Sequence, residues 1–331
     1  MKPTSPPTSA LTSLPRIAIL DDYHNRAHQF ADWSSASYAD FQFFAEHHAS
    51  TDQLVKDLQG FDAVGLMRER TPFPKSVIDQ LPNLKLIVTS GKKNASIDVK
   101  AADAKGITVC GTESPGHATA ELAFLLTMAL SRKLVPLSNA LQQQNDWQPV
   151  MGRDMRGQTL GIVGLGRLGG QLAGFANAMG MQVIAWSENL TEERCNEFNV
   201  TKVSREELFT QADTVSIHLR HSDRTHNFIT QDDLKLLGSN SYIVNTSRAE
   251  IIDLGALRYA LDHNIIAGAA LDVFDVEPAD DSNWMVTHPK ILATPHVGYC
   301  TDETFTVFYG QMLEAFDAFF NRDAIRVIAP G

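Results

Sequence analysis

The part of the sequence best suited to chemistry is a glycine-rich turn, Gly164-Leu165-Gly166-Arg167-Leu168-Gly169. It directly follows a short apolar run, Leu160 to Val163, and directly precedes a helical run, Gln171 to Met179. Between a strand and a helix, the first glycine makes a tight turn, the second lets backbone amides approach a pyrophosphate, and the third lets the helix pack on the strand. The amino terminus of the helix then attracts the anion. A glycine pattern alone also fits an ordinary turn, but this setting predicts a dinucleotide site.

The strand after this turn should end in an acidic residue that binds the adenosine ribose, and that position holds Ser187. Glu188, one residue further on, can bond the ribose and repel a 2′-phosphate. Arg194 or Arg220 can instead attract that phosphate, although Arg220 also fits a solvated surface cation. The sequence therefore favours NAD as the cofactor and leaves NADP open.

The rest of the chain supplies the elements that must position this turn. Short apolar runs alternate with amphipathic stretches, which is typical of parallel strands joined by crossover helices, so we expect an α/β fold with doubly wound sheets. The stretch Thr119 to Leu130 is apolar nearly all round and should be buried between domains or subunits. The expected strands are Ile17 to Leu20, Ala63 to Met67, Leu84 to Thr89, Leu160 to Val163, Gln182 to Trp186, Thr214 to Leu219, Tyr242 to Asn245 and Ile266 to Leu271.

Length, composition and charge restrict the class of protein. A chain of 331 residues with 44% hydrophobic residues exceeds one ordinary core and suggests roughly two domains. The net charge of -11 argues against a nucleic-acid partner, which would need clustered Lys and Arg. The cysteines Cys110, Cys195 and Cys300 are far apart and give neither a disulfide framework nor metal-ligand spacing, so we expect no metal.

The sequence also predicts where the protein resides. No window approaches the roughly 20 uninterrupted apolar residues that a membrane-spanning helix needs, and Met1 to Leu14 lacks the charged and apolar regions of a secretory signal. We therefore expect a cytoplasmic protein with no membrane partner. Residues 1–14 are rich in Pro, Ser and Thr and should form a disordered tail, because they have too little apolar surface to offset the entropy of ordering.

Four motifs, found in this order along the chain, resemble those of the D-isomer-specific 2-hydroxyacid dehydrogenases. The first is the glycine-rich turn at residues 164–169. The others are Val244-Asn245-Thr246-Ser247-Arg248, Leu271-Asp272-Val273-Phe274-Asp275-Val276-Glu277-Pro278 and Thr294-Pro295-His296-Val297-Gly298. The resemblance extends from about Arg16 to the end of the chain.

This resemblance implies a domain layout. Residues 15–110 and 299–331 would form a flavodoxin-like substrate domain, and residues 111–298 would form a Rossmann nucleotide domain inserted into it. The active site would lie in a cleft at the carboxyl ends of the strands, where open parallel sheets bind ligands. The resemblance further implies a homodimer formed through the nucleotide domain.

The resemblance also implies a reaction, the transfer of a hydride between NAD(P) and C2 of a small D-2-hydroxy acid or its 2-keto acid. His296 would donate a proton to the C2 oxygen during reduction and take it back during oxidation. Glu277 would bond the far imidazole nitrogen, which fixes the tautomer and favours the protonated ring. Arg248 would hold the substrate carboxylate by a forked pair of hydrogen bonds. Taken alone, each of the three residues also fits an ordinary structural or surface role.

Further contacts are carried over from the same motifs. The expected cofactor contacts outside the glycine-rich turn are Thr246, Asp272 near the nicotinamide carboxamide, His218 near the adenosine half, and Gly298. In most relatives a proline follows the strand of His218, whereas here Leu219 is followed by Arg220, so the adenine contact stays open.

The segment Ser90 to Asn94 corresponds to the family loop whose backbone amides face the substrate carboxylate, with Gly91, Lys92 and Lys93 as the expected substrate-binding residues. Its two lysines, with Arg68 or Arg70, suit a second anionic group on the substrate, such as a phosphate or another carboxylate. They also fit solvated surface cations.

Two other functions stay open. C-terminal-binding-protein corepressors resemble the same dehydrogenases, and that interpretation would make the chain an NAD(H)-sensing binding protein. It gains little from the sequence, because no basic or low-complexity tail follows the fold, which we expect to end at about Ala329. A phosphite or formate dehydrogenase would act on a substrate without a C2 hydroxyl. The formate version is disfavoured, because such enzymes need a glutamine where Glu277 stands.

Overall fold

The computed structural model describes residues 14–321 and 323–330. The chain divides into two compact units, Met1–Pro115 with Thr301–Gly331, and Gly116–Cys300. Each unit contains one parallel sheet flanked by helices, so the predicted α/β class with two doubly wound sheets is confirmed. The domain boundaries expected at residues 110/111 and 298/299 stay a prediction. The expected tail, residues 1–14, lies outside the described residues except for Leu14.

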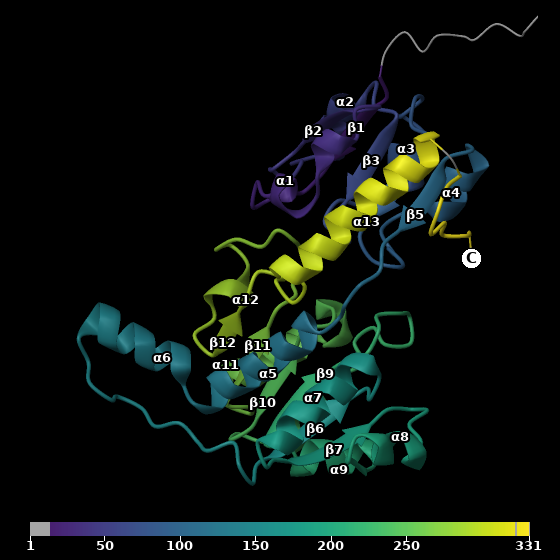
Figure 1. The fold of residues 1–331 in the computed structure, drawn as a ribbon. Coiled ribbons are helices and arrows are strands. Elements are labelled where there is room, and N and C mark those ends of the chain that lie inside the picture. The colour runs from purple at the N-terminus through teal and green to yellow at the C-terminus, as the bar shows by residue number, and fades with distance from the viewer. Residues whose placement is uncertain (1–13, 322, 331) are drawn as a thin grey trace, which may run out of the picture. The chain divides into compact units, whose positions relative to one another are not determined.

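The first unit is built on a five-stranded parallel sheet (Figure 1). Its strands are β1 (Arg16–Ile19), β2 (Asp40–Phe43), β3 (Ala63–Leu66), β4 (Leu86–Thr89) and β5 (Thr108–Gly111). They lie in the order β2-β1-β3-β4-β5, the flavodoxin-like arrangement. Both β3 and β4 are buried at every position, as parallel strands are when helices cover both faces of the sheet.

Several short helices and one long helix flank this sheet. The helices of the first unit are α1 (Ala27–Phe30), the 3-10 helix η1 (Trp33–Ser35), α2 (Thr51–Leu58), α3 (Lys75–Ile78), α4 (Val99–Ala104) and α13 (Asp302–Asn321). Helix α2 begins at Ser50, whose side chain accepts a hydrogen bond from the Gln53 amide. Helix α13 buries an aromatic face that includes Phe308, Tyr309 and Phe316. The C-terminal segment therefore completes the core begun by the first 115 residues.

The second unit contains a seven-stranded parallel sheet. Its strands are β6 (Thr159–Val163), β7 (Gln182–Trp186), β8 (Thr201–Lys202), β9 (Thr214–Ile217), β10 (Tyr242–Asn245), β11 (Gly268–Leu271) and β12 (Ile291–Ala293). They lie in the order β12-β11-β10-β9-β6-β7-β8. The direction in which strands are added reverses between β6 and β9, and ligands of open parallel sheets bind at the carboxyl ends of the strands beside such a switch point.

The helices of the second unit include the apolar helix α5 (Ala118–Ser131), which is only partly buried in this unit. They are α5 (Ala118–Ser131), α6 (Leu134–Asn139), the π-helix η2 (Ala140–Gln144), α7 (Arg167–Ala178), α8 (Glu192–Glu197), α9 (Arg205–Gln211), α10 (Gln231–Leu237), the 3-10 helix η3 (Ala249–Ile251), α11 (Leu254–Asp262) and α12 (Trp284–Thr287). Helix α5 buries Ala120, Ala123 and Leu126, but Leu125 on another face is 54% exposed. Helix α6 projects away from the sheet of this unit (Figure 1).

Within residues 14–321 and 323–330, no helix combines the length and the apolar composition that crossing a bilayer requires. In the same ranges, no three His, Cys, Asp or Glu side chains gather closely enough to hold a metal ion.

Candidate active site

The glycine-rich turn connects β6 to α7 with the geometry that a phosphate-binding turn requires. Gly164 adopts a φ of +100°, and a Cβ atom there would lie 2.9 Å from the backbone oxygen of His218. A Cβ atom on Gly169 would collide with the backbone oxygen of Gly164. A Cβ atom on Gly166, in contrast, would meet nothing within 4 Å. Gly164 and Gly169 are therefore packed against backbone atoms, whereas space is open beside Gly166. Gly166 is the position where backbone amides must face a pyrophosphate.

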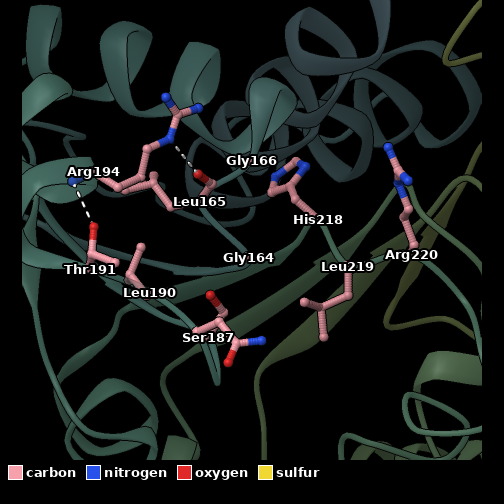
Figure 2. Close-up of a pocket in the computed structure, with 11 residues that line it drawn as sticks. Gly164, Leu165, Gly166, Ser187, Leu190, Thr191, Arg194, His218, Leu219 and Arg220 are labelled. Carbon is pink, nitrogen blue, oxygen red and sulfur yellow. Dashed lines mark hydrogen bonds between the residues drawn. The ribbon is translucent and has the colours of Figure 1, made fainter.

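A cavity of about 320 Å³ opens beside this turn (Figure 2). The carboxyl ends of β6, β7 and β9 contribute to it through Gly164, Ser187 and His218. It is also lined by four more residues that the sequence suggested for cofactor binding, namely Leu165, Gly166, Arg194 and Arg220. Arg167, Leu168 and Gly169 belong instead to α7, and Glu188 is exposed and does not line the cavity. The open face of Gly166 and this cavity at the switch point fit a bound dinucleotide.

His218 is held in this wall as a neutral ring. Its Nε2 atom lies 2.9 Å from the Ser216 hydroxyl, and its Nδ1 atom is buried with no hydrogen-bond partner among the described residues. Burial lowers the pKa of His218 from 6.5 to about 4. The ring is thus uncharged near neutral pH, and the hydrogen-bonding capacity of Nδ1 is unused within the described residues.

The structure brings His296 and Glu277 together. His296 Nδ1 lies 2.6 Å from Glu277 Oε2, and Glu277 Oε1 accepts a hydrogen bond from the Phe274 amide at 2.9 Å. The pKa of Glu277 is lower than its ordinary value, although burial of the side chain alone would raise it. Burial is outweighed by the hydrogen bond and charge of His296, the hydrogen bond from the Phe274 amide and the charge of Arg248. Glu277 is therefore ionised near neutral pH and can accept a hydrogen bond from the Nδ1–H of the ring.

The backbone of His296 is held in an unusual conformation. Its φ is +51°, in the left-handed region that residues other than glycine rarely adopt. The surrounding segment is fixed by Asp272, which follows β11 and is 1% exposed. Asp272 Oδ1 accepts hydrogen bonds from the Thr294 hydroxyl at 2.6 Å and the Val297 amide at 2.9 Å, while Oδ2 accepts from the Gly298 amide at 2.9 Å. One buried carboxylate thus holds both sides of the loop that presents His296.

Arg248 lies on a neighbouring loop that follows β10. Its Nη1 donates to the Ser247 carbonyl at 2.7 Å, and its own carbonyl accepts from Asn245 Nδ2 at 2.8 Å. Thr246, in the same loop, has a buried hydroxyl with no hydrogen-bond partner in the described part of the chain. The loops after β10 and β11 and the loop of His296 after β12 all leave the same edge of the sheet, because the strands are parallel and adjacent.

In the first unit, the loop after β4 is tightly organised. The Gly91 amide donates to the Thr112 hydroxyl at 2.7 Å, and Arg68 Nη1 donates to the Ser90 carbonyl at 3.1 Å. Lys92 Nζ lies 2.7 Å from Glu113 Oε2. Arg70 is also engaged, with Nη1 donating to the Asp21 carbonyl at 2.8 Å. Among the four cations considered from the sequence, Lys93 is exposed and has no ion pair within the described residues.

Some functional features were not anticipated from the sequence. Asn189, Leu190 and Thr191 line the cavity beside Ser187, in the loop between β7 and α8. The Thr191 side chain caps α8 by accepting from the Arg194 amide, so the Thr-Glu-Glu-Arg run would have signalled a helix start close to the site. The role of Asp272 as an anchor of the His296 loop had no sequence signal beyond its place in the motif.

Comparisons with known proteins identify the family of this chain. Residues 124–298 match the family described as D-isomer specific 2-hydroxyacid dehydrogenase, NAD binding domain. The chain is 33% identical over 275 residues to the glyoxylate reductase of Aeropyrum pernix, covering 77% of this chain and 82% of that one. The chain therefore belongs to the D-isomer-specific 2-hydroxyacid dehydrogenases. It is an NAD-dependent enzyme of this family, and its cofactor is NAD(H).

Two further relatives show how far the likeness extends. The chain is 34% identical over 250 residues to the D-3-phosphoglycerate dehydrogenase of Bacillus subtilis, covering 75% of this chain but 47% of that one, so it spans about half the length of this relative. The crystal structure of a phosphoglycerate oxidoreductase from Vibrio cholerae superposes with a TM-score of 0.88 at 33% identity, over 93% of this chain and 99% of that one. All three relatives are named as enzymes, which favours catalysis over nucleotide sensing.

Proposed function

We propose that this protein transfers a hydride between NAD(H) and C2 of a small D-2-hydroxy acid or its 2-keto acid. The observation that carries the proposal is the contact of 2.6 Å between His296 Nδ1 and Glu277 Oε2, on the same sheet edge as the dinucleotide cavity. An imidazole whose far nitrogen is fixed by an ionised carboxylate is suited to exchange a proton with a substrate oxygen. The relatives named as glyoxylate reductase and D-3-phosphoglycerate dehydrogenase support substrates of this class.

The chain's own residues divide the work around the substrate. When bound, the nicotinamide supplies or accepts the hydride. His296 Nε2 donates a proton to the C2 oxygen during reduction and removes it during oxidation, while Glu277 keeps Nδ1 protonated and the ring oriented. Arg248 binds the substrate carboxylate through its planar guanidinium, which stays charged at all working pH values.

The proposed cofactor contacts follow from the glycine-rich turn, the lining of the cavity and one buried hydroxyl. The amides around Gly166 would hold the pyrophosphate, and Ser187 would face the adenosine ribose. The buried hydroxyl of Thr246, without a partner among the described residues, would bond the nicotinamide half. Asp272 and Gly298 act on this half of the site through the His296 loop that they hold.

The loop of Gly91, Lys92 and Lys93 would contribute to substrate binding. Because Lys92 already pairs with Glu113, Lys93 is the cation that remains to meet a second anionic group such as a phosphate. Glyoxylate, hydroxypyruvate and a dianionic 2-keto acid should therefore differ in KM, with the dianion lowest. Lys93→Gln should raise the KM of the dianion selectively, and equal KM values in the wild type would reject this second-anion hypothesis alone.

The decisive experiment is a panel of 2-keto acids assayed with NADH, with phosphite and NAD as a separate arm. Reduction of at least one 2-keto acid, with the D-2-hydroxy acid as product, is the expected result. Oxidation of phosphite without any keto-acid reduction would replace the proposal by the phosphite-type reaction. Nucleotide binding without any turnover would replace it by a sensing role.

We also propose a homodimer formed through the second unit, with a second copy of this chain as the partner. The segment that follows α5 carries large apolar side chains at the surface. Leu134 is 55% exposed, Leu141 50%, Trp147 74% and Met151 91%. So much apolar surface on one projecting segment is typical of a surface that another chain covers.

A further inference from the structure

The adenosine end of the cavity lacks the carboxylate that normally binds the ribose of NAD. The strand β7 ends at Trp186, and the next residue, Ser187, lines the cavity with a short neutral side chain. No residue that lines the cavity in the described chain is acidic. Glu188 is exposed and is not part of the lining. A carboxylate at this position favours NAD because it bonds the ribose hydroxyls and repels a 2′-phosphate, so its absence removes that discrimination.

Two arginines line the same cavity. Figure 2 shows Arg194 and Arg220 on either side of the glycine-rich turn in this view. Arg194 is largely committed, because Nε donates to the Leu165 carbonyl at 3.1 Å, Nη1 pairs with Glu197, and the guanidinium lies 4.4 Å from the centre of the Phe198 ring. Its main effect is to hold the glycine-rich turn and to add positive charge.

Arg220 differs from Arg194 in the contacts that its guanidinium makes with the described residues. Its guanidinium has no ion pair or hydrogen bond within the described residues, and the side chain is exposed at the rim of the cavity. It follows β9 at the position after Leu219, directly beyond the switch point of the sheet. Nothing in the described chain therefore competes with an anionic ligand for the five N–H donors of this guanidinium.

We propose that Arg220, with Ser187 and the charge of Arg194, forms a binding site for the 2′-phosphate of NADP(H), so that this enzyme uses the phosphorylated cofactor in addition to NAD(H). The guanidinium would bind two phosphate oxygens through its forked N–H groups, and the Ser187 hydroxyl would donate to a phosphate oxygen. This inference rests on the proposed dinucleotide site beside Gly164 and names the cofactor class that the site selects.

The direct test measures binding without catalysis. Isothermal titration calorimetry with 2′,5′-ADP and with 5′-AMP compares the same adenosine with and without the 2′-phosphate. The wild type should bind 2′,5′-ADP at least about tenfold more tightly, which corresponds to one or two charge-assisted hydrogen bonds. Raising the salt concentration should reduce this ratio, because the added contact is ionic and partly exposed.

Three variants test whether Arg220 and Ser187 cause the preference for 2′,5′-ADP. Arg220→Gln should weaken binding of 2′,5′-ADP by about 10- to 100-fold more than binding of 5′-AMP. Arg224→Gln is the matched control, since Arg224 is an exposed arginine in the same loop that does not line the cavity, and it should keep the wild-type ratio. Ser187→Asp should reverse the preference towards 5′-AMP, because the new carboxylate would repel the phosphate.

The outcomes separate this inference from the proposed function. If the wild type reduces a 2-keto acid with NADH but binds 2′,5′-ADP no more tightly than 5′-AMP, the inference is overturned and the proposed function stands. If 2′,5′-ADP binds with the expected dependence on Arg220 but no keto acid is reduced with NADH or NADPH, the proposed function fails and the phosphate site stands. Equal losses in Arg220→Gln and Arg224→Gln would assign the effect to general surface charge and overturn the inference.

Discussion

The carboxylate of Asp272 accepts a hydrogen bond from the backbone amide of Gly298 at 2.9 Å, two residues after His296 in the chain. A Cβ atom on Gly298 would lie 3.0 Å from the same carboxylate oxygen, so glycine is the residue that allows this approach. The geometry of the proposed acid/base residue thus depends on a buried carboxyl group that follows the neighbouring strand. His296 can hold its left-handed backbone conformation because its flanking residues are fixed from both sides.

Asp272→Asn tests this anchoring role. The amide keeps the shape of the side chain but cannot accept at both oxygen positions, so it loses one of the three hydrogen bonds to the loop. We expect a loss of about 1–3 kcal/mol in the free energy of unfolding, measured by urea denaturation, and a fall in kcat. Asp281→Asn, an exposed position, is the control and should change neither quantity. An Asp272→Asn protein with wild-type stability and wild-type kcat would show that the loop holds itself.

His296→Ala tests the proposed proton donor. Removal of a positioned acid/base should lower kcat for keto-acid reduction by roughly 100- to 10,000-fold while NADH binding, measured by fluorescence titration, changes little. His28→Ala, an exposed histidine of the first unit, serves as the control. Turnover at the wild-type rate by His296→Ala would contradict the assignment.

Glu277→Gln tests the partner of His296. The amide keeps the shape of the side chain but removes the charge that faces the proposed proton donor, so kcat for keto-acid reduction should fall by roughly 10- to 100-fold while NADH binding, measured by fluorescence titration, changes little. Wild-type kcat in Glu277→Gln would count against a role for this carboxylate.

Burial of His218 should make the free energy of unfolding depend on pH below neutrality. In the folded protein burial lowers its pKa to about 4, whereas the unfolded chain binds a proton at the ordinary value of 6.5. Between these values the unfolded state holds more protons, so the free energy of unfolding falls as the pH decreases, by up to about 3 kcal/mol. Urea denaturation at pH 7 and pH 5 should show a loss in the wild type that exceeds the loss in His218→Gln by about 2 kcal/mol. Equal losses in the two proteins would contradict the burial of an uncharged ring.

The exposed segment after α5 predicts the assembly. Leu141→Lys combined with Trp147→Lys should convert the expected homodimer to a monomer, because two charges would be buried at the contact. Light scattering after gel filtration measures the mass directly. Tyr259→Lys, at a 44% exposed position on α11, is the control and should leave the dimer intact. A monomeric wild type would reject the dimer.

The sequence predicted the interior of both sheets and missed their edges. Every apolar run assigned as a strand became one, from β1 to β11. The strands that were not predicted are β2 and β5 in the first sheet and β8 and β12 in the second, which are the four edge strands. The edge strands β2 and β8 are partly or fully exposed and carry no continuous apolar signal. The edge strands β5 and β12 are more buried, but the apolar runs within them are only two and three residues long.

The site shows a similar division. Motifs located the glycine-rich turn and indicated that His296 and Glu277 belong together, because those roles depend on residue type and order. They gave no sign that Asp272 would hold the loop of His296 or that Arg194 would be committed to Leu165 and Phe198. Such contacts depend on side-chain directions across strands and helices, which a linear pattern does not specify.

The hydroxyl of Thr119 donates to the carbonyl of Gly298 at 2.8 Å, so the first helix and the last loop of the second unit are joined near the points where the chain enters and leaves it. A segment whose two ends meet in this way can be gained or lost by a host protein as a single cassette, with little disturbance to the host's own strands. The bond between Thr119 and Gly298 also ties the first helix of this unit to the loop of His296, which Asp272 holds from the other side.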